Sequence, residues 1–400
     1  MKKNLLSPAV VLASIVLSAL ACAKKAADIP TNNSPVITAI FPAAAHGGDT
    51  IIARGKNLPA DVGAISVSIN NKRAIIISLT PDSLKAVVPD LSGSGKLLLS
   101  VNGKEYPGPD FTYTYKVTVT TIAGTGNIGI SNGPGQSASF YCPWGIAADK
   151  NGDLFIADTY NRLIRKIAAK DNTVSSYSIP VQPGGSNFYS PYNIAIDTAT
   201  HNLYLTDFNE HVMRMDAAGN MSVIYIDSMP LAGIAVSPDG KSLYISNNTR
   251  GTIIKTTTDG KNAAVFTSGL TTPRNIIFDN KGSMFVAAYP ASIYGISTTN
   301  GKAVAIATDP GFQGWEIAAD TQGNFYLADH FANCIRKIDK SGVSSIIAGS
   351  GIAKDVDGMG LEAAFDGPQG LAIDAAGNLF VSTYNYTTKT GNKIRKVSFQ

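Results

Sequence analysis

Short stretches in which hydrophobic and polar residues alternate cover most of the chain after residue 34. Clear examples lie at residues 36–42, 50–58 and 95–103, with Gly, Pro, Asn or Asp residues between them. Alternation with a period of two places successive side chains on opposite faces of a β-strand, and the residues between the stretches favour turns. The pattern therefore predicts an all-β protein built from many short strands.

Residues 34–115 form the first group of predicted strands and have the size of a small β-sandwich. The segment opens with P-x-I-x-x-I-x-P at residues 35–42 and continues with GGDT at 47–50, RGKNL at 54–58 and VVP at 87–89. These motifs resemble the IPT/TIG immunoglobulin-like domain. The resemblance implies a spacer or binding module without catalytic residues.

The remainder of the chain, residues 116–400, is repetitive. The unit PWGIAAD, GDLFIAD, IRKI at residues 143–167 is nearly copied at residues 314–338. The first aspartate of the unit aligns in six places, at Asp149, Asp197, Ser237, Asp279, Asp320 and Asp374. Repeats of this length with three or four strands are typical of propeller blades. The unit resembles the NHL repeat, with weaker matches in the third and fourth copies, and implies a six-bladed NHL-type β-propeller.

The two ends of the repeat region predict how the ring closes. The sixth unit stops after the IRKV stretch at residues 394–397 and lacks a fourth strand. Residues 117–126, which precede the first unit, match residues 343–351, the fourth strand of the fifth unit. We therefore expect the strand around residues 117–122 to complete the last blade, so that no sheet edge is left open.

The N-terminus has the pattern of an export signal. Lys2 and Lys3 precede an apolar run that ends in Ala-Leu-Ala-Cys at Cys22, so residues 1–21 are expected to be a cleaved signal peptide. Cys22 after small residues resembles the bacterial lipoprotein box, which implies lipidation of Cys22 and a tether over residues 22–33. The expected location is the cell envelope, with a lipid anchor in the outer membrane.

Composition narrows the classes of partner. The formal net charge is +4, and loss of Lys2 and Lys3 with the signal leaves 31 basic against 29 acidic residues. A chain this close to neutral lacks the basic field that nucleic-acid binding requires. Cys142 and Cys334 fall at unlike positions of the repeat, so both are expected to be free and buried, and no zinc-ligand spacing is present.

Three recurring motifs have structural interpretations. GTGNIG at residues 124–129 spells a dinucleotide-binding pattern, but Gly and Pro residues follow where a helix would have to begin. The arginines of IRKI are expected to form structural ion pairs. The second aspartate of the unit, at Asp158, Asp207 and Asp329, is expected to accept hydrogen bonds from loop amides.

The candidate binding residues stand at the start of the innermost strand of each blade, on the face where propellers bind ligands. From the first repeat to the sixth, the variable residue x of the P-x-G-I motif is Trp144, Tyr192, Ala232, Arg274, Trp315 and Gln369. Neighbouring loops add further aromatic or imidazole rings, among them Tyr160, Tyr289, His330 and Tyr384. Aromatic faces with a few polar groups suit a carbohydrate or a peptide. The same rings could instead fill the channel as a structural plug, and the sequence leaves both possibilities open.

The next position of the same strand offers a metal alternative. Asn193, Asn275 and Glu316 occupy equivalent inner places. Propeller hydrolases and lactonases hold calcium or zinc with such a set at the channel mouth. Calcium is therefore the alternative to an expectation of no cofactor.

These observations favour an exported, membrane-anchored, non-catalytic binding or scaffold protein that acts as a monomer. Its ligand, a carbohydrate or a peptide, would bind at the channel mouth. One alternative is a metal-dependent hydrolase, lactonase or lyase at the same mouth. The other is a protein–protein adaptor of the cell envelope. Exported chains that combine these two modules resemble those of Bacteroidetes-type bacteria.

Overall fold

A computed structural model describes residues 34–400 except 91, 181–189, 208, 291 and 309–314. The expected signal peptide, Cys22 and the tether lie outside the described residues. Two compact units divide between Tyr113 and Thr114. Strands connected by short turns make up nearly all of both units, and the 3-10 helices are Val62–Ala64 (η1), Gly135–Ser137 (η2), Thr159–Asn161 (η3) and Gly360–Glu362 (η4). No helix of the described residues is long and apolar enough to cross a membrane.

The first unit is the predicted sandwich-like domain. Its strands pair in the order β1-β3-β6-β5-β4-β7-β8-β2. They are β1 (Val36–Phe41), β2 (Ala44–Ala45), β3 (Thr50–Lys56), β4 (Ile65–Ile69), β5 (Lys72–Leu79), β6 (Ser83–Val87), β7 (Gly95–Val101) and β8 (Lys104–Tyr113). The alternation seen in the sequence is maintained: in β4, Ile65, Val67 and Ile69 are buried, and the serines between them are only partly so.

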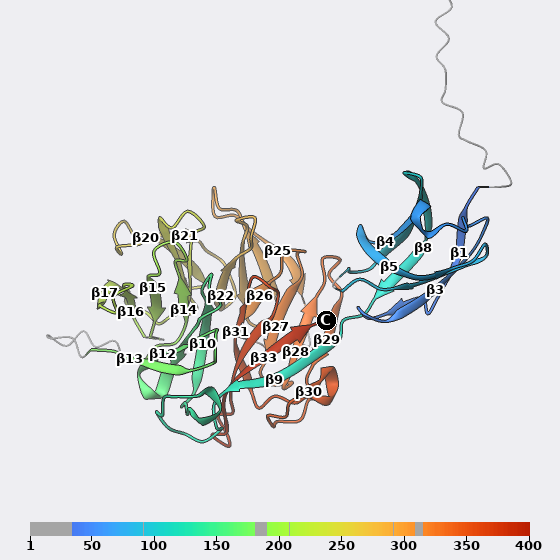
Figure 1. Cartoon of the computed structure of the whole chain (residues 1–400). Helices are drawn as coiled ribbons and strands as arrows, with labels where there is room; N and C mark the ends of the chain where they lie inside the picture. Colours follow the sequence, from blue (N-terminus) through green and yellow to red (C-terminus); the bar gives the residue numbers. More distant parts are fainter. Residues whose placement is uncertain (1–33, 91, 181–189, 208, 291, 309–314) are drawn as a thin grey trace, which may run out of the picture. The chain divides into compact units, whose positions relative to one another are not determined.

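The second unit is the predicted six-bladed propeller (Figure 1). Blade 1 contains β10 (Pro143–Ala148), β11 (Leu154–Asp158), β12 (Leu163–Ile167) and β13 (Val174–Ser178). Blade 2 contains β14 (Ile194–Ile196), β15 (Leu203–Thr206), β16 (His211–Met215) and β17 (Met221–Ile226). Blade 3 contains β18 (Leu231–Val236), β19 (Ser242–Asn247), β20 (Thr252–Thr257) and β21 (Ala264–Thr267). Blade 4 contains β22 (Pro273–Phe278), β23 (Met284–Ala288), β24 (Ser292–Ile296) and β25 (Ala303–Thr308). Blade 5 contains β26 (Ile317–Ala319), β27 (Phe325–Asp329), β28 (Cys334–Ile338) and β29 (Ser344–Ala348).

Blade 6 closes the ring as the sequence predicted. It pairs strands in the order β30-β9-β33-β32-β31, with β9 (Val117–Ala123), β30 (Gly358–Met359), β31 (Pro368–Ile373), β32 (Leu379–Tyr384) and β33 (Gly391–Phe399). Strand β9 lies antiparallel to β33, with Val119 opposite Val397, and Figure 1 shows the two side by side although they are far apart in the sequence. The first and last strands of the ring thus share one sheet, which prevents the blades from separating at that point.

The core of the propeller lies between blades. One cluster joins Ile146 and Ile156 of blade 1 to Phe380 and Ile394 of blade 6, all buried. The first strand of each blade contacts the first strands of its neighbours, so these strands surround the channel. Burial of apolar area between adjacent sheets is the main stabilising contribution in such an arrangement.

Candidate functional site

A register shift at the start of the inner strands sets the direction in which the candidate side chains point. In blades 1, 3, 4 and 6, the register of the first strand pair shifts at this point, for example between Pro143 and Ile146. A bulge changes the direction of the side chains that it contains. Trp144, Ala232, Arg274 and Gln369 all fall within these shifts.

Aromatic rings and one guanidinium pack together at this end of the channel. The indoles of Trp144 and Trp315 meet edge to face, with ring centroids 5.2 Å apart. Tyr192 lies on the other side of Trp144 at 4.4 Å between centroids, and the Cζ atom of Arg274 lies 3.4 Å from the centroid of the Trp315 ring. Trp144 is only 7% exposed and Tyr192 only 6% exposed. We call Trp144, Tyr192, Trp315 and Arg274 the aromatic plug.

A cavity of about 390 Å³ lies beside the aromatic plug. Four of its lining residues are sequence candidates: Trp144, Tyr160, Tyr192 and Trp315. The others are Cys142, Thr159, Ser190, Asp207, Asn209 and Tyr386. The packed rings of the aromatic plug thus also form part of the wall of an adjoining cavity. We call this cavity the mouth pocket.

The mouth pocket presents neutral groups. Burial raises the pKa of the Cys142 thiol and of the Tyr192 and Tyr386 hydroxyls, so all three remain protonated at neutral pH. Asp207 is the acidic lining residue, and its carboxylate accepts the amides of Asn209 and His211 and lies 2.8 Å from His211 Nδ1. The walls therefore combine flat apolar faces and protonated hydroxyls with the one carboxylate of Asp207.

Asn193, Asn275 and Glu316, the metal alternative, link neighbouring blades. Asn193 Oδ1 accepts the amide of Ile234 at 3.3 Å, and Asn275 Oδ1 accepts that of Ile317 at 3.2 Å. Glu316 repeats the pattern, since its Oε2 accepts the amide of Leu371 at 2.9 Å and its Oε1 accepts a bond from Asn193 Nδ2. Each side chain reaches the backbone of the next blade.

Glu316 is the acidic residue of this set of three, and its pKa departs strongly from the ordinary value. Burial raises its pKa to about 8, against the lowering effect of the bonds from Leu371 and Asn193. Both carboxylate oxygens are already acceptors within the propeller. Among the described residues, no group of three His, Cys, Asp or Glu side chains is placed to hold a metal ion. The oxygens of Asn193, Asn275 and Glu316 are thus all engaged in hydrogen bonds between blades.

Blades that lack such a side chain have glycine in its place. A Cβ atom at Gly233 would lie 2.0 Å from the carbonyl oxygen of Arg274, and one at Gly370 would lie 2.0 Å from that of Trp144. Hydroxyls complete these links: Ser246 Oγ donates to the Arg274 carbonyl, and Ser382 Oγ donates to that of Trp144. Close approach of the inner strands requires glycine here.

Gln369 and His330 support the plug and do not line the pocket. Gln369 is fully buried, and its Nε2 donates to the carbonyl of Tyr384 at 3.0 Å. The His330 ring lies 6.4 Å from the Trp315 ring and 5.6 Å from the Tyr386 ring, between centroids. Burial lowers the pKa of His330, so its imidazole is neutral at pH 7.

The recurring acidic and basic residues have the structural roles expected of them. Asp158 accepts the amide of Tyr141 and pairs with Arg165 at 2.8 Å, and both side chains are fully buried. Asp329 pairs with Arg336 at 2.7 Å and accepts the amide of Ala332. The two described cysteines, Cys142 and Cys334, form no disulfide and are buried, as predicted.

Sequence reasoning missed several pocket residues, chiefly Tyr386. This ring lies 5.8 Å from Trp144 and 5.0 Å from Tyr384, between centroids. It belongs to the loop between β32 and β33, which is longer than the matching loop of blade 1. The only signal in the sequence was the insertion NYTTKTGN at residues 385–392, where the repeat is interrupted.

Two family models match the chain. The IPT/TIG domain model matches residues 35–126, and the teneurin NHL domain model matches residues 117–308. The chain thus combines an IPT/TIG domain with an NHL-type six-bladed propeller. Among characterised sequences, it is 21% identical over 300 residues to the Arabidopsis thaliana chloroplastic protein SUPPRESSOR OF QUENCHING 1. That match covers 67% of this chain but only 26% of the plant protein, so the chain spans about a quarter of its relative's length.

Solved structures share the fold at low identity. A Bacteroides thetaiotaomicron protein of unknown function matches with a TM-score of 0.63 and 22% identity, covering 92% of this chain and 99% of the other. An auxiliary nutrient binding protein from Bacteroides ovatus matches at 0.57 and 16%, with coverages of 92% and 99%. A streptogramin B lyase matches at 0.50 and 14%, covering 71% of this chain and 98% of the lyase. At these identities the likeness establishes the fold alone.

Proposed function

We propose that the protein is an exported, membrane-anchored binding protein that holds a carbohydrate in the mouth pocket. Lipidation at Cys22 would attach it to the outer membrane, within the cell envelope, and residues 22–33 with the IPT/TIG domain would act as tether and spacer. The nutrient-binding neighbour from Bacteroides is compatible with this role.

One observation carries the proposal: a cavity of about 390 Å³ has walls made chiefly of aromatic rings and neutral hydroxyls. The size suits a ligand of one or two sugar rings, because small-molecule sites range upward from about 300 Å³. The exposed ring of Tyr160 offers a face on which a sugar can stack, the edges of Trp144 and Trp315 add apolar wall, and Thr159, Ser190 and Asn209 offer hydrogen bonds to ring hydroxyls. A peptide would meet the same walls but needs a longer groove for its backbone.

A catalytic role gains little from the same geometry. The thiol of Cys142 is held protonated by burial, which removes the reactive thiolate. Asn193, Asn275 and Glu316 are engaged between blades. An adaptor role does not need the mouth pocket and would leave its rings unused.

The test is a glycan array probed with the wild-type protein, residues 34–400, and with its Trp144→Ala variant. We expect hits among neutral saccharides that the variant loses. Absence of hits from an array that also covers peptidoglycan fragments would contradict the carbohydrate proposal, and capture of a peptide by the mouth pocket would replace it. Retention of every hit by Trp144→Ala would place binding elsewhere.

A further inference from the structure

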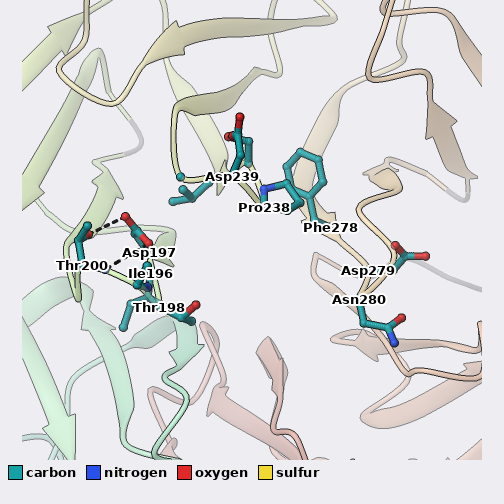
Figure 2. A pocket seen from close by; sticks show the side chains of 13 residues that line it. Ile196, Asp197, Thr198, Thr200, Pro238, Asp239, Phe278, Asp279 and Asn280 are labelled. Carbon is teal, nitrogen blue, oxygen red and sulfur yellow. Dashed lines mark hydrogen bonds between the residues drawn. The ribbon is translucent and has the colours of Figure 1, made fainter.

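The face opposite the mouth pocket has a second, larger cavity. It measures about 580 Å³ and is lined by the turns after β14, β18 and β22, which belong to three successive blades. Figure 2 shows its labelled side chains coming from these separate turns, with Asp197 bonded to Thr200. Three aspartates line it, Asp197, Asp239 and Asp279, and no lysine or arginine does.

This cavity continues into an apolar throat. Ile196, Val236 and Phe278 line both the larger cavity and a space of about 260 Å³ inside the channel. Apart from Asn275, the side chains that line that space are apolar, and they include Ile146, Ile194, Ile234, Ile276, Ile317 and Leu371. Each of those six residues is at most 6% exposed, and no residue that lines this space also lines the mouth pocket.

Negative charge is concentrated around the opening of the throat. The six turns that join the first and second strands, at residues 149–153, 197–202, 237–242, 279–283, 320–324 and 374–378, hold seven aspartates and three lysines. Asp153 is offset by Lys166, whose Nζ lies 2.7 Å away. The five turns between third and fourth strands, farther from the axis, hold four aspartates and four lysines at residues 168–173, 216–220, 257–262, 297–302 and 339–343. The excess of acid therefore surrounds the channel only.

Two carboxylates of this inner rim, Asp197 and Asp239, are ionised at neutral pH. Hydrogen bonds from Thr200 to Asp197 and from Ser237 to Asp239 hold the pKa of both acids below the usual value, although burial opposes this at Asp197. Asp279 Oδ1 accepts the amides of Lys281 and Ser283. An acidic rim around an apolar hole repels nucleic acids and anionic lipid, and it attracts basic protein segments.

We propose that this face docks a basic segment of a protein partner, which inserts one apolar side chain into the throat while its lysines or arginines pair with Asp239 and Asp279. An apolar anchor in a blind hole with charged neighbours at the rim is the usual arrangement of a peptide hot spot. The site is independent of the mouth pocket, since the buried inner ring separates the two.

The test is fluorescence anisotropy with a labelled Lys-Lys-Leu-Lys-Lys peptide. Matched peptides replace Leu with Gly, or every Lys with Glu. We expect the Leu peptide to bind, the Gly peptide to bind about tenfold more weakly, and the Glu peptide not to bind, with loss of affinity at high salt. Equal binding of the Leu and Gly peptides, or no binding of the Leu peptide, would overturn the proposal.

Variants locate the site. The double change Asp239→Asn with Asp279→Asn keeps the turn acceptors and should weaken the Leu peptide about tenfold. Asp216→Asn is the matched control, because Asp216 accepts the amides of Ala218 and Asn220 in an outer turn of the same type. Ala319→Leu, which narrows the throat, should also weaken binding. Thermal melting confirms that each variant is folded, and an equal effect of the control and the double change would contradict the assignment.

Discussion

The indole of Trp144 packs edge to face against the indole of Trp315, with their centroids 5.2 Å apart and their planes at 86°. The two residues start the inner strands of blades 1 and 5, and they are the only tryptophans of the chain. Both residues also line the adjoining mouth pocket. The same pair therefore contributes to the stability of the ring and to the surface offered to a ligand.

Tyr160 should contribute to binding without contributing much to stability. Its ring is 49% exposed and lies 4.9 Å from Tyr141, between centroids. We expect Tyr160→Ala to weaken saccharide binding about fivefold to tenfold, since one stacking surface is lost. Phe331→Ala is the control, because Phe331 is 61% exposed and does not line the pocket. Calorimetric titration of both variants checks this, and equal affinities would contradict the position of the ligand.

Glu316 should make stability depend on pH. Its pKa in the folded protein, about 8, lies above the ordinary value of 4.5. The stability that the protonated form contributes is complete below pH 4.5 and is lost as the pH rises through 8. Glu316→Gln removes this dependence. It also replaces one acceptor oxygen by an NH₂ donor, which then faces another donor, either Asn193 Nδ2 or the Leu371 amide.

The variant should therefore be less stable than the wild type by about 1–3 kcal/mol, and the difference should shrink as the pH rises from 5 to 8. Urea unfolding at several pH values measures both quantities. A difference that stays constant from pH 5 to 8 would contradict the raised pKa, because it would mean that Glu316 is ionised in the folded protein throughout this range.

Gly233 should not tolerate a side chain. Gly233→Ala places a Cβ 2.0 Å from the Arg274 carbonyl oxygen, so the inner strands of blades 3 and 4 must separate. The expected loss is about 1–3 kcal/mol in the free energy of unfolding. Gly295→Ala is the matched control, because its nearest contact would be Ile306 at an ordinary 3.4 Å. Equal midpoints in thermal unfolding would contradict the close approach of the strands.

Arg165 should be required for folding of blade 1. Its guanidinium lies 2.8 Å from Asp158 and also donates to the carbonyls of Ser139 and Ser131. Arg165→Ala leaves a buried carboxylate without its cation, which costs about 3–5 kcal/mol. Lys261→Ala removes the exposed pair with Asp259 and should leave the midpoint within experimental error. A small effect of Arg165→Ala would mean that Asp158 is protonated in the folded protein.

The repeat pattern predicted the architecture and four of the ten residues that line the mouth pocket, because blade spacing and strand alternation are local signals. It placed Trp144 and Trp315 at one end of the channel and β9 beside β33. It could not predict that Asn193, Asn275 and Glu316 bond to the next blade, because that depends on how closely the inner strands approach. It also missed Tyr386, which lies in an insertion that has no counterpart in the other repeats.

The most direct test of the central claim is tryptophan fluorescence during titration with a saccharide identified on the array. Both indoles of the chain line the mouth pocket, so bound sugar must change their surroundings. We predict a saturable shift of the emission and protection from acrylamide quenching, with the same dissociation constant as calorimetry gives. Binding seen by calorimetry with unchanged emission and unchanged quenching would contradict a ligand in the mouth pocket.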